Sequence, residues 1–361
     1  MTLRLITLVV KEMMAGTKPS LYPLAQLEHV VLRAPITGVP PGYNMVFVAP
    51  FFYLPKLEFL ATTGLGIQRS HLRDVHDDEP CWVEGDRQHV ALNPDLYISR
   101  FPVGTSPIET LVLNRACFYN SGLLVLVRAC RVLKKLVLNV SHSGRVIIAV
   151  TTGDLEHNDR VVAKLEDLSK AIAYHSSSLE EVTFDIRNEL DWADYRHYHK
   201  TTAPLALYDC LKNMQRLKRL TIHIEFLYRK ATPIVWATKV ELVIDRLPPT
   251  LEHLVLKRHY AVDATVLDGE MRHYRTILDD CRPDGHLPKL KSLDVPLCYE
   301  RSREFRFFED AEELETLAAS IGVQIIFREH PTDWSVPQVP EPYPPLQYCR
   351  ELSDSTGLTL S

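Results

Sequence analysis

The phrase L-x-x-L-x-L, three apolar residues at fixed spacing, constrains this chain more than any other feature. Two clear copies, Ile108–Leu113 and Leu133–Leu138, flank a stretch from Leu123 to Cys130 whose apolar residues fall at helical spacing. Side chains alternate between the two faces of a strand. The leucines of each copy are therefore expected to be buried, with the residues between them on the opposite face. Because a helix joins the two strands, they should be parallel neighbours.

The phrase recurs along most of the chain, with insertions between copies. Further copies begin at Leu27, Leu57, Leu179, Leu217, Leu251 and Leu290. Such repetition of strand and helix is typical of a leucine-rich-repeat solenoid. We therefore expect an α/β fold, an irregular leucine-rich-repeat solenoid with a curved parallel sheet and helices on its outer face. A doubly wound α/β fold is the alternative, because strands alternating with helices describe it too.

Other segments have periodicity or end signals of their own. Helices are predicted for Met1–Ala15, Asp159–Ile172, Pro204–Met214, Met271–Leu278 and Ala311–Ile321, the last closed by Gly322 as a C-cap. Additional strands are predicted for Val240–Ile244 and Val323–Phe327, and Gly144–Val150 is either a further strand or part of an irregular connection. The predicted organisation is a leucine-rich-repeat-like domain over 1–330, with an insertion at about 65–107, and a Pro-rich flexible tail over 331–361.

Composition bounds the function. The net charge is −5, with 41 basic and 46 acidic residues interspersed, so no basic stripe points to nucleic acid. No apolar run approaches the about 20 residues of a membrane span, and we expect no membrane partner. The 7 cysteines contain no C-x-x-C pair, which fits reduced thiols in the cytoplasm or nucleus.

Catalytic signals are sparse. Cys117, Cys130, Cys210 and Cys298 lie in or beside apolar repeat positions, where a cysteine is commonly a small buried hydrophobe. The loop from Asp191 to His199, with its His-x-His pair, is the alternative site for an α/β enzyme. A structural zinc site usually takes four ligands, with Cys or His dominant, so we expect a solvated loop there. We predict no enzyme, no catalytic residue, no metal and no cofactor.

The repeat region, roughly Leu27 to Phe327, resembles that of fungal F-box-like leucine-rich-repeat proteins. The residues that carry the resemblance are SPIETLVLNRACF, LVRACRVLKKLVLNV, YHSSSLEEVTFDI, MQRLKRLTI, LPPTLEHLVL and LPKLKSLDV. The resemblance implies a protein partner or substrate held by the repeats, and a Skp-type adaptor of a cullin ubiquitin ligase. Residues Met1–Pro50 contain no F-box motif.

We therefore predict a non-enzymatic protein-interaction scaffold, one form of which is substrate recognition for a cullin-type ubiquitin ligase. Besides the enzyme, a truncated protein without activity is an alternative. The partner is expected on the concave sheet face, at residues that lie between the repeat leucines. These are His29, Arg33, Asn114, Lys135, Asn139, Glu181, Asp185, Arg219, His223, His253, Lys257 and Asp294.

Overall fold

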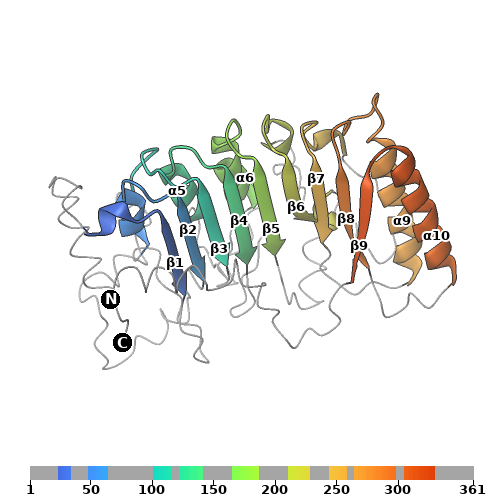
Figure 1. Cartoon of the computed structure of the whole chain (residues 1–361), viewed down its shortest axis with the longest axis horizontal. Coiled ribbons are helices and arrows are strands. Elements are labelled where there is room, and N and C mark those ends of the chain that lie inside the picture. The colour runs from blue at the N-terminus through green and yellow to red at the C-terminus, as the bar shows by residue number, and fades with distance from the viewer. Residues whose placement is uncertain are drawn as a thin grey trace, which may run out of the picture.

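A single all-parallel sheet organises the molecule. The computed structural model describes residues 23–33, 48–63, 101–114, 122–140, 165–186, 210–227, 244–257, 264–297 and 305–329. Nine strands form one sheet, and their order in space is their order along the chain (Figure 1). The strands are β1 (His29–Arg33), β2 (Phe59–Thr63), β3 (Thr110–Asn114), β4 (Lys135–Val140), β5 (Glu181–Ile186), β6 (Arg219–His223), β7 (His253–Lys257), β8 (Ser292–Leu297) and β9 (Gln324–Glu329).

The strand order distinguishes between the two predicted architectures. The strand order of a doubly wound sheet reverses at a switch point. Here each strand pairs with the strands that precede and follow it in sequence, from β1–β2 through β8–β9. The α/β class and the parallel neighbours are therefore confirmed, and the doubly wound alternative is wrong.

The register explains why the repeat phrase produces strands. Partnered residues carry the same position of the phrase, so that Leu111 lies opposite Leu136 and Leu220 opposite Leu254. The resulting row of side chains is completely buried: Leu60, Leu111, Leu136, Val182, Leu220, Leu254 and Leu293 are each 0% exposed. Burying a leucine side chain contributes about 2 kcal/mol, so one row stabilises the whole stack.

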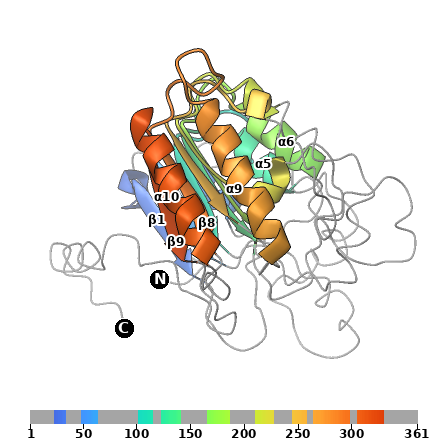
Figure 2. The ribbon, with the colours of Figure 1, turned by 90° about the vertical axis from the view of Figure 1, so that its right-hand side faces the viewer.

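Helices cover the face of the sheet into which these leucines point. The α-helices are α5 (Gly122–Ala129), α6 (Leu165–Tyr174), α9 (Ala264–Asp279) and α10 (Phe305–Ser320). Short 3-10 helices are η2 (Pro23–Gln26), η4 (Ala49–Tyr53), η6 (Ile224–Leu227) and η8 (Ile244–Arg246). Figure 2 shows α5, α6 and α9 along one side of the sheet. The main core lies between the two layers.

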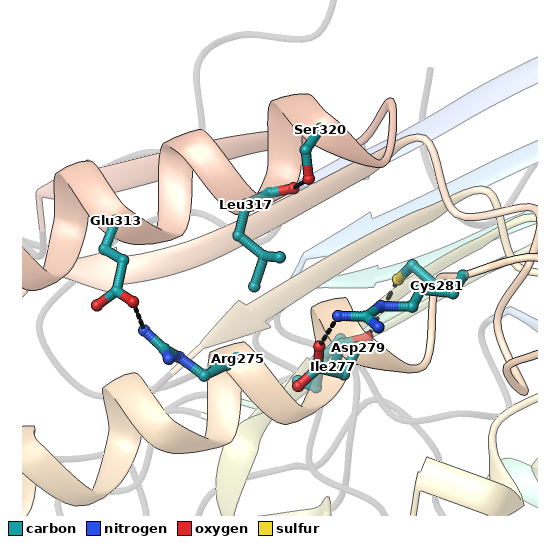
Figure 3. A network of polar contacts seen from close by, with 8 residues as sticks. Arg275, Ile277, Asp279, Cys281, Glu313, Leu317 and Ser320 are labelled. Carbon is teal, nitrogen blue, oxygen red and sulfur yellow. Dashed lines mark hydrogen bonds and ion pairs between the residues drawn. The ribbon is translucent and has the colours of Figure 1, made fainter.

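The last two helices lie together at the β9 end of the sheet (Figure 1). An ion pair between Arg275 of α9 and Glu313 of α10 joins them, with 2.5 Å between Nη2 and Oε1 (Figure 3). Leu317 packs against the main core from α10. The chain then turns at Gly322, whose φ of 74° confirms the predicted C-cap.

Some predicted helices and strands need correction, and others lie outside the described residues. Helix α10 begins at Phe305, earlier than the predicted Ala311, because the Phe and Arg residues between them break the apolar period. Ile244 lies in η8, so the predicted strand does not extend to it, and the rest of Val240–Ile244 is outside the described residues. Met1–Ala15, Gly144–Val150 and the tail at 331–361 are outside them as well.

Most of the predicted insertion at 65–107 also lies outside the described residues. Its C-terminal end is part of the core. Phe101 is buried and packs edge-on against Phe52, with ring centroids 5.3 Å apart. None of the helices described is long and apolar enough to cross a membrane.

Candidate interaction surface

The side chains at the first, third and fifth positions of the strands define a second sheet face, which we call the polar face. Because the repeat leucines occupy the second and fourth positions, the alternation of a strand turns the odd positions away from the main core. Every residue predicted to bind a partner occupies an odd position of its strand, Arg33 being placed by its backbone register with Thr63. The register therefore places these residues on one face of the sheet, while their role in binding and the curvature of that face stay predictions.

The register brings several predicted residues into contact along this face. Residues at the same strand position form a row across the sheet, and we number the rows by that position. In the first row, Lys135 Nζ lies 2.8 Å from Glu181 Oε1. In the fifth row, Asn139 Nδ2 donates a hydrogen bond to Asn114 Oδ1 at 2.6 Å. His29 is exposed and meets Phe59 edge-on, with ring centroids 5.6 Å apart. Several polar side chains of this face therefore already have hydrogen-bond or ion-pair partners on neighbouring strands.

The centre of the fifth row is a buried charge cluster. Asp185 accepts a hydrogen bond from Lys257 Nζ at 2.5 Å, and His223 Nε2 lies 3.6 Å from its other carboxylate oxygen. Asp185 and His223 are only 3% and 2% exposed, and they come from β5 and β6, with Lys257 on β7. Burying a carboxylate is costly unless a cation compensates it. Lys257 supplies that compensation across the intervening strand.

A second buried acid lies at the β9 end. Asp294 is 4% exposed, and Arg328 Nε and Nη2 lie 2.7 Å and 2.6 Å from its Oδ2. Arg328 was not among the predicted residues, because β9 does not repeat the L-x-x-L-x-L phrase. The available sequence signal was that Arg328 is the fifth residue of the strand β9, a position that points to the polar face.

Accessibility differs between the two halves of the polar face. In the third row, Ala61, Val112 and Val137 are buried and form a second small cluster with Phe59. Further along this row, the third-position residues of β5, β6 and β7 are half-buried: Thr183, Thr221 and Val255. Arg219, in the first row of β6, is exposed. Over β5–β7 the polar face is therefore more accessible than over β2–β4, and we call the region over β5–β7 the accessible part; the edge strand β1 is also exposed, at His29 and Val31.

A line of charged residues, which the sequence analysis did not predict, lies directly before the first residues of the strands. Lys134 Nζ lies 2.6 Å from Glu109 Oε2, and this hydrogen bond raises the pKa of Lys134. The same arrangement recurs as Lys218–Glu180 at 3.6 Å and Lys291–Glu252 at 2.5 Å. All these residues occupy the first x of L-x-x-L, which was the available signal. Exposed pairs contribute little stability, but opposite charges side by side favour this register.

Cys130 is buried, as expected from the sequence, and so is Cys281, which was not among the cysteines considered there. Burial raises the pKa of Cys130 and of Cys281 to about 12. Each thiol donates to a carbonyl one helical turn back, at Leu126 and Ile277 respectively. A thiol held in this way is a poor nucleophile, because the thiolate is the reactive form. Cys210 is buried as well.

The other candidates for catalysis or metal binding lie outside the described residues. Cys117, Cys298 and the loop from Asp191 to His199 are outside the described residues. Within the described part of the chain, no group of His, Cys, Asp and Glu side chains could hold a metal ion.

Comparison with protein-family models, with curated protein sequences and with solved structures found no match for this chain.

Proposed function

We propose that this protein is a non-enzymatic scaffold that binds a protein partner on the polar face. In this proposal the chain is an irregular leucine-rich-repeat solenoid, and the sheet is curved around the partner. The supporting observation is the register, which lines up odd-position side chains from consecutive strands in straight rows on one face. A surface fixed by a sheet loses little conformational entropy on binding.

One form of this role is substrate recognition for a cullin-type ubiquitin ligase, in the cytoplasm or nucleus. The resemblance of the repeat phrases to those of fungal F-box-like proteins supports this form. Affinity purification of the full chain from its native cells, followed by mass spectrometry, tests it. Recovery of a cullin together with a Skp-type adaptor is the expected result. Capture of other proteins without either would contradict the ligase form and leave the scaffold proposal intact.

The scaffold proposal is tested by blocking the accessible part of the polar face. Thr221 is half-buried at the third position of β6, so Thr221→Trp places a bulky side chain over the middle of β5–β7. Thr276, on the exposed side of α9, allows the same substitution away from this face, as Thr276→Trp. We expect Thr221→Trp to reduce quantitative partner capture at least about tenfold, as a clash at an interface core does.

The control variant Thr276→Trp should capture the same proteins as the wild type. Circular dichroism and the urea unfolding midpoint establish that both variants are folded. Undiminished capture by folded Thr221→Trp would show that the partner does not use the polar face.

A further inference from the structure

The charge balance of the first row indicates which kind of partner the polar face accepts. Lys135, Glu181 and Arg219 follow one another in register on β4, β5 and β6. The Glu181 carboxylate pairs with Lys135, at 2.8 Å. No described residue forms an ion pair with Arg219, which is exposed. Among the described residues, Arg219 is therefore a cation without an ionic partner in the middle of the accessible part.

The described acids of the polar face are already paired with basic side chains of the sheet. Besides Glu181, the acidic residues described on this face are Asp185 and Asp294, each bound to a basic side chain and nearly buried. A partner cation would have to displace Lys257 or Arg328 from a short ion pair. A partner carboxylate only has to reach Arg219, whose planar guanidinium can bind it through two hydrogen bonds.

The third-position side chains in the middle of the accessible part are short. Thr183, Thr221 and Val255 are short side chains at the third position of β5, β6 and β7, between the long side chains of the first row and Lys257 in the fifth. Neighbouring strands lie about 4.8 Å apart, so crossing three of them takes about 10 Å, or about three extended residues. A carboxylate on such a segment could sit over β6, within reach of Arg219.

We propose that the polar face over β5–β7 binds an extended acidic segment of the protein partner, with Arg219 as the main carboxylate anchor. The inference rests on the scaffold function proposed above and specifies the chemistry of its partner. A nucleic acid is disfavoured, because it needs a stripe of many uncompensated cations rather than one.

The experiment uses fluorescein-labelled Gly-Ser peptides that carry three spaced Glu, Gln or Lys residues, together with a labelled oligothymidylate. Each probe is titrated with the full chain, and binding is followed by fluorescence anisotropy at an ionic strength of about 0.15 M. The Glu peptide should bind more tightly than the other three probes. Arg219→Glu should weaken its binding about tenfold or more, because a charge-assisted hydrogen bond is replaced by repulsion.

Arg216→Glu is the matched control. Arg216 is exposed in the turn before β6, off the polar face, and its substitution changes the net charge by the same amount. It should leave the affinity for the Glu peptide within about twofold of the wild type. Equal weakening by both variants, tighter binding of the Lys peptide or the oligothymidylate, or no binding of the Glu peptide by the wild type would each overturn the inference. Loss of partner capture in Thr221→Trp would still support the scaffold, so the two proposals fail separately.

Discussion

His175, at the turn after α6, joins segments that are far apart in sequence. Its Nε2 lies 2.9 Å from the carbonyl oxygen of Val127 in α5, and the backbone N–H of Leu133 donates to its Nδ1 at 3.4 Å. Since a ring nitrogen that accepts from an N–H carries no proton, the imidazole is neutral with its proton on Nε2. Burial lowers the pKa of His175, and the hydrogen bond to Val127 opposes this shift only in part. The side chain thereby fixes α6 against α5.

The lowered pKa predicts how His175 affects stability as the pH changes. Below its ordinary pKa of 6.5 the imidazole takes up a proton more readily in the unfolded chain than in the folded one. The stabilisation is therefore complete above that pH and decreases as the pH falls through the folded-state pKa. We expect His175→Gln to cost about 1–3 kcal/mol at pH 7 and less at pH 5, measured by urea unfolding. A cost that increases toward pH 5 would contradict this assignment.

The junction between α10 and β9 illustrates how one helix end is specified. Gly322 N–H donates to the carbonyl of Ala319 at 3.2 Å, and Val323 N–H donates to the carbonyl of Ala318 at 2.9 Å. These two bonds form a Schellman motif, which requires a left-handed residue at the position of Gly322. The sequence predicted this end because glycine is the residue that adopts the conformation most readily. It did not predict the start at Phe305, because Glu304 is not a preferred N-cap residue and no regular apolar period marks the boundary in the sequence.

Gly322 offers a clean test of this conformational requirement. Its φ is 74°, and a Cβ added there would meet nothing within 4 Å. The cost of Gly322→Ala should therefore be conformational alone, about 1–2 kcal/mol, seen as a lower urea unfolding midpoint. Gly322→Asn should cost less, since Asn visits the left-handed region more readily than Ala does. Equal midpoints for the wild type and Gly322→Ala would disprove the requirement.

At the level of the whole molecule, the buried leucine row makes neighbouring repeats depend on one another. Leu220 is 0% exposed in β6, with partnered strands on both sides, while Val30 lies half-buried in β1, at the end of the described sheet, where β2 is its one described neighbour. We expect Leu220→Ala to lower the free energy of unfolding by about 2–5 kcal/mol. Val30→Ala removes less buried surface and should cost about 1 kcal/mol. Similar losses for the two variants in urea titrations would contradict this difference between centre and end.

Much of this architecture could be predicted because the repeat phrase combines a period of two in the strands with helical spacing between them. The phrase located the strands and assigned Arg219 and Lys257 to one face. It could not predict that Asp185 and His223 are buried, since their exposure depends on the packing around a cluster whose members Asp185 and Lys257 are 72 residues apart. Nor could it predict that Val112, which is 0% exposed, is buried away from the main core. Local spacing specifies the sheet face toward which a side chain points, whereas the burial of that side chain depends on distant parts of the chain.

The consecutive strand order has a consequence for how this protein is made. Each strand is hydrogen-bonded only to the strands before and after it in sequence, so its pairing surface exists as soon as the preceding repeat has left the ribosome. No strand of the described sheet has to wait for a partner from the far end of the chain. The sheet can therefore grow at the pace of translation, and exposed leucines are covered by the next repeat to emerge.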